Sequence, residues 1–446
     1  MKILLINPPR SSENKILEFA PEKAKPFIHK KLIGPPLGLL TVAAAVKDFD
    51  VFVYDLKGEY DLNPEAPALE NIVLHLLKEY QPDVVGTTLI TSEFYSGITI
   101  FKTVKKHNPE ILTVAGGLHA TLCPQDFSYP CFDIICPGQS AHTFREVILA
   151  KINDQAFSTV GGILINTPEG IVKSANPAPG RNAADRDFLM PDRTHLRKWI
   201  NTYKVGNSPF PSTYLFTSLG CPHQCSFCSI WPSFNGCFYQ RNTESVIEEL
   251  KMTGDYPVVR FADANTIVET HFINRLFDRI KEEGIRKDFV MDIRFDTAVM
   301  HSGLIEKLAR NGLKVVICGF ESFREKELLK YKKGASAKLI EEAINIFHQN
   351  GIMLRGNYVI PNNYDEQDFE ALADYAHAHQ VVYAGYTILS PMPGTAFYKD
   401  VKNQIIDHDL SKYNFFNSVM KTKLPVEKFY ETIGRLWLIK KGTDVI

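Results

Sequence analysis

The sequence predicts an α/β protein with two domains built on parallel sheets, followed by a short helical segment. The chain has 446 residues, more than one ordinary domain contains. Short β-branched runs alternate with helical stretches over residues 1–150, and the alternation resumes with a new period over residues 208–400. The runs are apolar without a polar alternation, as expected when helices cover both faces of a parallel sheet.

Residues 1–150 are predicted to form a doubly wound, Rossmann-like domain. Its strands are expected at 2–6, 51–54, 84–88 and 111–115, and its helices at 38–46, 69–80 and 98–107. No G-x-G-x-x-G turn follows the first strand, which argues against a dinucleotide site. Sheets of this kind bind ligands at the carboxyl ends of their strands, so we expect the binding residues there.

A connector and a second domain follow. Residues 151–207 are predicted as the connector, with a small hairpin over 161–173 and a linker over 176–191 that is rich in Pro, Ala, Asn and Asp. Residues 208–400 are predicted as a partial (β/α)6 TIM-like barrel with its chemistry at the carboxyl ends of the strands. Its strands are expected at 213–218, 258–262, 290–294, 314–319, 354–360 and 385–390. Residues 401–446 form the short helical region, with its clearest helix at 426–441.

The overall charge and hydropathy exclude some classes of partner. The chain has 50 basic and 51 acidic residues, a net charge of −1, without a basic stripe, so we expect no nucleic-acid partner. The longest apolar runs, such as 315–320, are strand-sized, and no transmembrane segment is expected. The apolar start meets Pro8 and Pro9 too early for a signal-peptide core, and we therefore expect a cytoplasmic protein.

Three cysteines in one loop carry the strongest chemical signal. Cys221, Cys225 and Cys228 lie within eight residues, directly after the first strand of the second domain. Three thiolates so placed can bind three irons of a cubane 4Fe–4S cluster and leave the fourth iron open to an external ligand. The alternative is a structural zinc site with His223 or Cys237 as fourth ligand, although zinc sites generally use two separated cysteine pairs. The other cysteines are interpreted as ordinary thiols: Cys123, Cys131, Cys136 and Cys318.

The CxxxCxxC spacing, with Phe227 before the last cysteine, resembles the signature of the radical S-adenosylmethionine superfamily. This resemblance implies that Cys221, Cys225 and Cys228 bind the cluster at the catalytic centre. It also implies that S-adenosylmethionine binds the open iron and is cleaved reductively to a 5′-deoxyadenosyl radical. An external low-potential electron donor of the flavodoxin or ferredoxin type is then expected.

Later segments match the same superfamily in order. Asp263 follows the second barrel strand, Arg294 ends the third, and Gly319–Ser322 resembles the family's "GxES" segment. Leu389–Thr395 resembles its late "L-x-P-x-PGT" segment. The resemblance implies that the cofactor is contacted by Phe227, Asp263, Arg294, Glu321 and Ser322. A helix cap is the alternative for Asp263, and an ion pair across the barrel is the alternative for Arg294 and Glu321. The turn after the fifth strand departs from the family, because Asn362 and Asn363 replace its glycines, although asparagine tolerates left-handed backbone.

The first domain resembles the cobalamin-binding domain joined to many of these enzymes. The matching segments are Asn7–Pro9, Pro35–Gly38, Gly116–Thr121 and Cys136–Ser140, where Gly138, Gln139 and Ser140 stand in place of the family's "GEG". The resemblance implies cobalamin as a cofactor, bound by Pro8, Ser92, Gly116, Gly117, Leu118, His119, Gly138 and Gln139.

Two of these residues have alternative interpretations. The D-x-H-x-x-G cobalt-ligating motif is missing, so His119 is expected to line the corrin pocket without binding cobalt. A turn histidine hydrogen-bonded to backbone is the alternative. Ser92 is expected at the nucleotide tail, although a helix cap explains it equally well. For the whole domain, a fold that has lost cobalamin, or a nucleotide or flavin site, are the remaining alternatives.

Together these features predict a cobalamin-dependent radical S-adenosylmethionine enzyme. The resemblance implies methylation of an unactivated carbon of a small or apolar substrate, through a 5′-deoxyadenosyl radical and methylcobalamin. One alternative is a radical cyclase or oxidase of tetrapyrrole or lipid type without methyl transfer. Another is a non-catalytic cobalamin or metal sensor.

Overall fold

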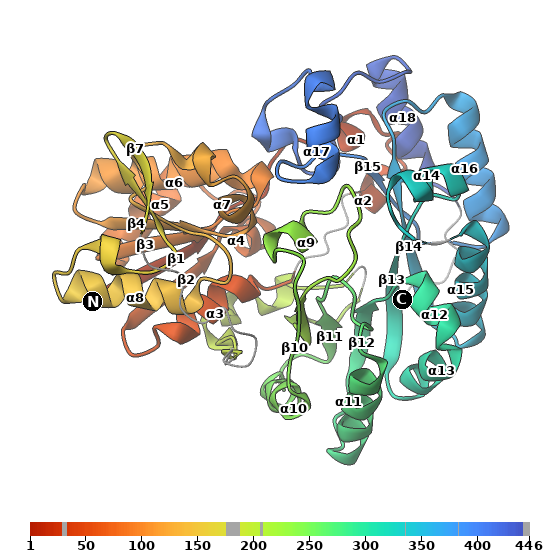
Figure 1. The fold of residues 1–446 in the computed structure, drawn as a ribbon, viewed down its shortest axis with the longest axis horizontal. Helices are drawn as coiled ribbons and strands as arrows, with labels where there is room; N and C mark the ends of the chain where they lie inside the picture. Colours follow the sequence, from red (N-terminus) through yellow and green to blue (C-terminus); the bar gives the residue numbers. More distant parts are fainter. Residues whose placement is uncertain (29–33, 175–187, 206–207, 335, 382, 440–446) are drawn as a thin grey trace. The chain divides into compact units, whose positions relative to one another are not determined.

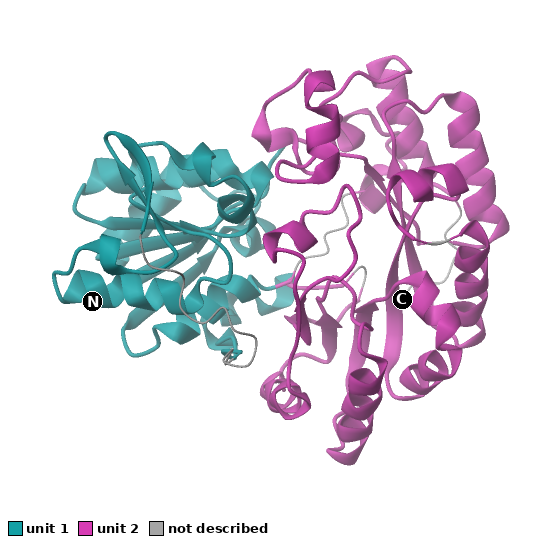
Figure 2. Cartoon of the chain, viewed as in Figure 1, with its two compact units in different colours: residues 1–12, 35–202 teal, residues 13–34, 203–446 magenta. Residues whose placement is uncertain are grey.

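The computed structural model describes residues 1–28, 34–174, 188–205, 208–334, 336–381 and 383–439. These residues form two compact units (Figure 2). Unit 1 comprises Met1–Ser12 and Pro35–Thr202, and unit 2 comprises Glu13–Gly34 and Tyr203–Ile446. A mainly parallel sheet runs through each unit, which confirms the predicted α/β fold class.

Unit 1 is a seven-stranded sheet with the order β2-β1-β3-β4-β5-β6-β7 (Figure 1). The first five strands are parallel, and the last two pair antiparallel at one edge. The strands are β1 (Lys2–Asn7), β2 (Asp50–Asp55), β3 (Val84–Thr88), β4 (Leu112–Gly116), β5 (Ile134–Cys136), β6 (Leu164–Thr167) and β7 (Gly170–Lys173). The main helices are α3 (Leu37–Ala45), α4 (Leu56–Leu62), α5 (Leu69–Tyr80), α6 (Phe94–His107), α7 (Leu118–Leu122) and α8 (Ala141–Ile152).

The predicted elements of residues 1–116 are present, and the structure adds to them. Strand β5 escapes sequence analysis because it has three residues, too few to show a pattern. The predicted hairpin of the connector exists as β6 and β7, but it extends the sheet: Ile134 pairs with Ile165 and Ile135 with Leu164. The first unit therefore continues beyond residue 150, and most of the predicted linker over 176–191 lies outside the described residues.

Unit 2 contains a curled, six-stranded parallel sheet with the order β15-β14-β13-β12-β11-β8, as predicted for a partial barrel (Figure 1). The strands are β8 (Ser212–Leu215), β11 (Val258–Phe261), β12 (Asp288–Asp292), β13 (Leu313–Glu321), β14 (Met353–Ile360) and β15 (Gly385–Ile388). A separate antiparallel hairpin joins β9 (Ser218–Gly220) and β10 (Phe238–Gln240). The longer helices are α10 (Thr243–Met252), α11 (Thr270–Glu282), α13 (Ser302–Arg310), α15 (Ala337–Gln349), α16 (Glu366–Ala378) and α18 (Val426–Leu436).

The core of unit 2 lies between the outer face of the curled sheet and the helices that cover it. Phe261 of β11, Phe277 of α11 and Phe289 of β12 are fully buried, and their rings pack with centroids 5.3–6.5 Å apart. In β14 the exposure alternates, so that Leu354 and Tyr358 face this core while Arg355 and Asn357 face the inside of the curl. This alternation leaves the inner face for function.

An N-terminal segment contributes to unit 2 and not to the domain in which the sequence placed it. Helix α1 (Lys15–Phe19) packs on α18, where the Phe19 and Tyr430 rings stack 5.9 Å apart. Two asparagines reinforce the contact, since Asn414 and Asn417 both donate their side-chain N–H to the Glu13 carbonyl. The packing joins segments about 400 residues apart, which no local pattern indicates.

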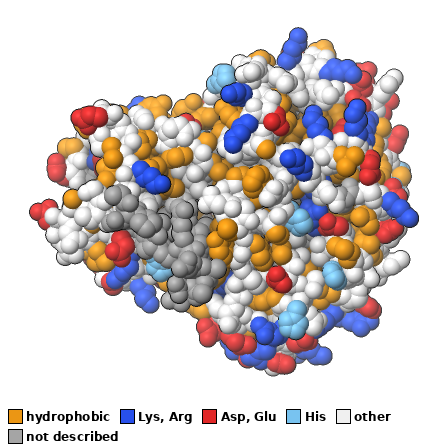
Figure 3. Space-filling model, viewed as in Figure 1, with side chains coloured by type: hydrophobic (Ala, Val, Ile, Leu, Met, Phe, Trp, Pro, Cys, Tyr) orange, Lys and Arg blue, Asp and Glu red, His pale blue; other side chains and the backbone are white. Residues whose placement is uncertain are grey.

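The face shown in Figure 3 carries interspersed basic and acidic side chains, without a patch of a single sign. Across the described residues, no helix is both long enough and apolar enough to span a membrane.

The contact between α1 and α18 gives a test of the packing. Gly434 of α18 faces Ala20, and an added Cβ would lie 2.7 Å from the Ala20 Cβ. We expect Gly434→Val to lower the free energy of unfolding by about 1–3 kcal/mol, because the two backbones must separate. Gly303→Ala in α13 is the matched control, since its Cβ would meet nothing within 4 Å. Chemical denaturation of both variants measures the difference, and equal stabilities would contradict the packing.

Candidate functional site

The three cysteines lie in a loop between the two strands of the β9–β10 hairpin. Gly220 ends β9 opposite Phe238, and the cysteines follow it directly. The backbone of Gly220 has φ +80°, and a Cβ there would lie 2.1 Å from the Cys237 carbonyl oxygen. Only glycine therefore fits at the base of this loop.

The thiols are largely withdrawn from water. Cys221 and Cys225 are each 8% exposed, and Cys228 is half-buried. Burial raises the pKa of Cys221 and raises that of Cys228 to about 11. The Ile230 N–H donates to Cys228 Sγ over 3.4 Å, a contact that favours the thiolate. Because burial disfavours a thiolate that has no counter-charge, these side chains suit a bound metal centre, whose positive charge deprotonates them.

Two observations bear on the kind of metal centre. One zinc ion needs its ligand atoms close together, since each bond is about 2.0–2.3 Å long. Among the described residues, the sulfur atoms of the three cluster cysteines do not form a group in which all ligand atoms lie within 4.8 Å of one another. Cys237 is exposed, its thiol directed to the Asn235 carbonyl. The spacing fits a cubane, which spreads three thiolates over three irons, better than a single zinc ion.

The middle of the loop is fixed to two other segments of unit 2. The Ser226 N–H donates to the Tyr331 carbonyl over 3.0 Å, and the Phe397 N–H donates to the Ser226 carbonyl over 2.8 Å. Phe227 packs edge-on against the Tyr331 ring, with centroids 5.7 Å apart. Trp231 donates its indole N–H to the Cys225 carbonyl over 3.0 Å. These contacts hold the loop against two other segments of unit 2.

Asp263, directly after β11, holds the strand that leads into the loop. Its carboxylate accepts hydrogen bonds from the backbone N–H groups of Thr217 and Ser218 at 2.8 and 2.7 Å. It also accepts from both hydroxyls, at 2.9 and 3.1 Å. Burial raises the pKa of Asp263 to about 6, and the four hydrogen bonds oppose that rise. In this structure the carboxylate is engaged by the protein itself.

A buried network of charges lies beside the cysteines. The Arg294 guanidinium donates to Asp296 at 2.6–3.2 Å and to the Lys333 carbonyl at 2.7 Å. The Lys333 ammonium donates to Glu321 Oε1 over 2.8 Å. Both cations oppose the rise that burial causes in the pKa of Cys221, so their charges act on the cluster loop.

The two ends of the predicted "GxES" segment have separate surroundings. Glu321 adopts a left-handed backbone, φ +63°, which turns its carboxylate to Lys333. Ser322 instead donates to Glu327 over 2.5 Å and accepts from the Arg324 N–H over 2.9 Å. The structure thus brings Arg294 and Glu321 together through Lys333, and it directs Ser322 to a different group of side chains.

Sequence analysis missed Lys333 and Trp231. Lys333 is 7% exposed, although its sequence context of two consecutive lysines before Gly334 is typical of a solvated turn. Trp231 follows the last cysteine by three residues, and only the loop geometry reveals its hydrogen bond to Cys225.

The residues predicted for cobalamin all lie at one edge of the unit 1 sheet. Pro8 follows β1, Ser92 follows β3, Gly116 ends β4 and Gly138 follows β5. These strands are neighbours and parallel, so their carboxyl ends share an edge. Leu118 and Gln139 belong to the same loops as Gly116 and Gly138.

Two glycines shape this edge. Gly117 has φ +96°, and a Cβ would lie 2.6 Å from the Leu89 backbone nitrogen, so the β4 turn closes tightly on the β3 turn. Gly138 has φ +73°, and a Cβ there would meet nothing within 4 Å. Its N–H is held by the Thr121 hydroxyl over 2.8 Å. Gly138 therefore presents bare backbone to open space, as a large cofactor requires.

His119 is fully buried in this structure. Its ring packs against Phe94 and Phe127, with centroids 5.0 and 5.6 Å away. Nε2 lies 3.2 Å from Asp126 Oδ2, but neither ring nitrogen makes a hydrogen bond with the described residues. Cys123 Sγ belongs to the same close group of potential ligand atoms. The expected contact of His119 with the corrin stays a prediction.

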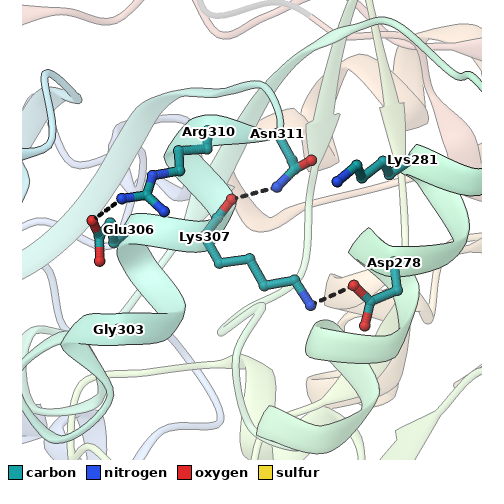
Figure 4. A pocket seen from close by; sticks show the side chains of 7 residues that line it. All are labelled: Asp278, Lys281, Gly303, Glu306, Lys307, Arg310 and Asn311. Carbon is teal, nitrogen blue, oxygen red and sulfur yellow. Dashed lines mark hydrogen bonds and ion pairs between the residues drawn. The ribbon is translucent and has the colours of Figure 1, made fainter.

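A hollow on the outside of unit 2 is not part of this site. It lies between α11 and α13 and is lined by Asp278, Lys281, Gly303, Glu306, Lys307, Arg310 and Asn311 (Figure 4). Lys307 pairs with Asp278 at 2.6 Å, and Arg310 pairs with Glu306. The charged side chains of this hollow largely neutralise one another on exposed helices.

Comparison with known protein families separates the chain into the same two parts. The family described as the radical SAM superfamily matches residues 215–376, and the family described as the B12-binding domain matches residues 27–148. The chain belongs to the radical S-adenosylmethionine enzymes that carry a cobalamin-binding domain. The cofactors of this family are a 4Fe–4S cluster, S-adenosylmethionine and cobalamin, as predicted.

Several characterised and uncharacterised proteins are similar along most of this radical S-adenosylmethionine enzyme. An uncharacterised methyltransferase of Pyrococcus horikoshii is 28% identical over 95% of this chain and 88% of its own length. The hopanoid C-3 methylase of Methylococcus capsulatus is 24% identical over 89% of this chain and 74% of its own length. The anaerobic magnesium-protoporphyrin IX monomethyl ester cyclase of Rubrivivax gelatinosus is 25% identical over 79% of this chain and 64% of its own length.

Solved structures share the fold. The radical S-adenosylmethionine methyltransferase TsrM of Kitasatospora setae, with cobalamin and a 4Fe–4S cluster bound, superposes with a TM-score of 0.71 at 17% identity. The match covers 97% of this chain and 84% of TsrM.

The residues present suit the cofactors of the family. Three withdrawn thiols, with buried cations beside them, form a donor set for a cluster with one open iron. In unit 1, the bare backbone at Gly138 leaves room for a large ligand, whereas the His119 ring is fully buried against Phe94 and Phe127. The fit rests on this geometry alone.

The glycine at the base of the cluster loop gives one test. We expect Gly220→Ala to lose most of its iron after anaerobic reconstitution, because the new Cβ collides with the Cys237 carbonyl and opens the hairpin. Gly236→Ala is the control. Gly236 also has a positive φ, +73°, but an added Cβ there would meet nothing within 4 Å. Iron and sulfide analysis compares the two proteins. Equal iron content would show that the hairpin does not hold the loop.

The hydrogen bonds of the Asp263 carboxylate give a second test of the site. We expect Asp263→Ala to lower the free energy of unfolding by at least about 2 kcal/mol, because two backbone N–H groups lose their acceptor in a buried place. Asp263→Asn should cost less, since its carbonyl can still accept from both. Urea denaturation of the apoprotein measures both values, and an alanine variant as stable as the asparagine variant would contradict the role.

Proposed function

We propose that this enzyme is a cobalamin-dependent methyltransferase that transfers a methyl group to an unactivated carbon of a small substrate. When bound, the cluster and cobalamin supply the reductive cleavage of S-adenosylmethionine and the carriage of the methyl group. The observation that carries the proposal is the three-thiol loop in a chain that also has a B12-binding unit.

We assign roles to the residues around the loop on the same basis. Cys221, Cys225 and Cys228 hold the cluster, and Asp263 positions the strand before them. Arg294 and Lys333 are buried cations suited to the carboxylate of S-adenosylmethionine. An external low-potential donor of the flavodoxin or ferredoxin type supplies the electron.

The residues assigned to cobalamin are those at the carboxyl edge of the unit 1 sheet. The backbone at Gly116, Gly117 and Gly138 allows close approach of the corrin, since none of the three carries a side chain. Pro8 and Ser92 lie at the ends of the two adjacent strands. Leu118, His119 and Gln139 complete the set, and none of them is assigned to cobalt.

A cyclase is the second candidate, because the similar proteins include an anaerobic cyclase as well as methylases. Both reactions would begin with hydrogen abstraction and would use the same residues around the cluster. They differ in whether the product gains a methyl group. The product therefore decides between them.

The proposal is tested with the anaerobically reconstituted full chain, S-adenosylmethionine, cobalamin and dithionite. We expect the wild type to hold iron and cobalamin together and to release 5′-deoxyadenosine. Cys225→Ala should lose iron and 5′-deoxyadenosine but keep cobalamin, since the mutation lies in unit 2. Cys237→Ala, at an exposed cysteine outside the cluster set, is the matched control and should behave as wild type.

Each outcome has a definite meaning. Iron without any cobalamin binding would overturn the proposal. A cyclised or oxidised product without a new methyl group would favour the second candidate. Unchanged biological output of Cys225→Ala, with no 5′-deoxyadenosine from the wild type, would favour a sensor.

A further inference from the structure

The inner face of the curled sheet carries a layer of charge that the cofactor set does not use. Arg260 of β11, Asp292 of β12 and Arg355 of β14 face inward from neighbouring parts of the sheet. Arg260 and Asp292 side chains are 18% and 22% exposed although they lie on central strands. Solvent therefore reaches the inside of the curl at this depth.

One carboxylate serves two guanidinium groups in this layer. Both carboxylate oxygens of Asp292 accept hydrogen bonds from Arg260, whose Nε and Nη2 donate over 2.8–3.0 Å. Arg260 also lies over the Tyr214 ring, 5.2 Å from its centroid. With Asp292 so engaged, Arg355 makes no hydrogen bond or ion pair with a described residue, and the layer keeps one positive charge in excess.

The surroundings of Arg355 make that excess costly. Burial and then the Arg260 charge lower the pKa of Arg355 to about 10, against the opposing effect of Asp292. The Arg355 side chain is half-buried, and the nearby carboxylate, Asp292, already accepts two sets of hydrogen bonds from Arg260. Retaining an arginine in this place is expected where a ligand supplies the missing negative charge.

The Asn357 amide lies against the bare backbone of a glycine beside Arg355. Gly385 of β15 lies next to Asn357, and an added Cβ would be 2.4 Å from Asn357 Oδ1 and 3.6 Å from Arg355 Nε. Asn357 follows Arg355 by two residues on the same inner face. This part of the inner face therefore presents the Arg355 guanidinium and the Asn357 amide. The backbone beside them, at Gly385, carries no side chain.

Below this layer the inner face is apolar. Val258, Val290 and Ile317 form a small separate cluster, joined by Val205 and Val315. Val258 and Val290 precede Arg260 and Asp292 by two residues on their strands. A charged group entering the curl thus meets the arginines before an apolar floor.

We propose that Arg355 binds a carboxylate or phosphate group of the substrate inside the curled sheet, so that this enzyme acts on an anionic substrate. The inference rests on the proposed function and names the substrate class for the same site. Arg355 belongs to a different group of charges from Arg294 and Lys333, which are bound to Asp296 and Glu321. The charges that act on Arg355 are instead Arg260, Asp292 and Tyr214.

The test measures anion binding without turnover. The full chain, reconstituted with cluster and cobalamin and supplied with S-adenosylmethionine, is titrated with inorganic phosphate or propionate against chloride of equal ionic strength. Thermal melting and calorimetry report binding. We expect at least one of the two anions to bind, and the tighter one identifies the substrate group as phosphate or carboxylate.

Variants separate this site from general anion binding. Arg355→Met should weaken the anion at least about tenfold, the loss of one charge-assisted contact, and should raise the melting temperature of the anion-free protein. Gly385→Ala, which keeps the charge but fills the space, should weaken binding as well. Arg310→Met, at an arginine that is 73% exposed on α13, is the matched control and should bind as wild type.

The opposite results would overturn the inference. Anion affinity unchanged in both Arg355→Met and Gly385→Ala would show that the site is elsewhere. A tenfold loss of S-adenosylmethionine affinity in Arg355→Met would assign the arginine to the cofactor. Because binding is read without product, a wild type that binds anion at Arg355 but forms no methylated product would contradict the proposed function alone.

Discussion

The carboxylate of Asp263 fixes where the cluster loop begins. Four hydrogen bonds from Thr217 and Ser218 tie the end of β11 to the residues that start the β9–β10 hairpin. The chain that follows has little conformational freedom. Gly220, three residues after Thr217, packs its backbone tightly against the Cys237 carbonyl. The positions of the three thiols follow from this anchor, and the contacts of Ser226 and Phe227 with Tyr331 hold the far side of the loop.

Charge balance explains why the residues around the loop are buried together. Thiolates are disfavoured by burial, and so are ammonium and guanidinium groups, but each stabilises the other when they are adjacent. Arg294 is neutralised by Asp296, and Lys333 by Glu321, so the network stays nearly neutral while its cations face the thiols. The deeper layer differs, because one carboxylate, Asp292, is paired with Arg260 while its charge also acts on Arg355, so that two guanidinium groups share one negative charge. This contrast between a balanced and an unbalanced layer distinguishes the cofactor end of the curl from its interior.

The carboxyl-edge rule for parallel sheets accounts for most of the correct predictions. In unit 1 it brings Pro8, Ser92, Gly116 and Gly138 to one edge, although they are spread over 130 residues of sequence. The same rule places Asp263 and Arg294 near the cysteines. It says nothing about which partner a side chain takes at that edge. Asp263 accepts hydrogen bonds from Thr217 and Ser218, and Ser322 donates to Glu327, while the expected contact of both with the cofactor stays a prediction.

The sequence alone determined the cluster loop and the two sheets, because these depend on contiguous residues: a cysteine spacing, a turn glycine, and apolar runs of strand length. Tertiary structure decided what depends on distant residues. It assigned Glu13–Gly34 to unit 2 through α18, buried Lys333 beside Glu321, and left Arg355 to share the charge of Asp292 with Arg260. The physical reason is that strand register and helix packing choose the neighbours of a side chain, and neighbours set its charge balance. Composition reveals that charges are present, but only the fold reveals which of them lack a partner.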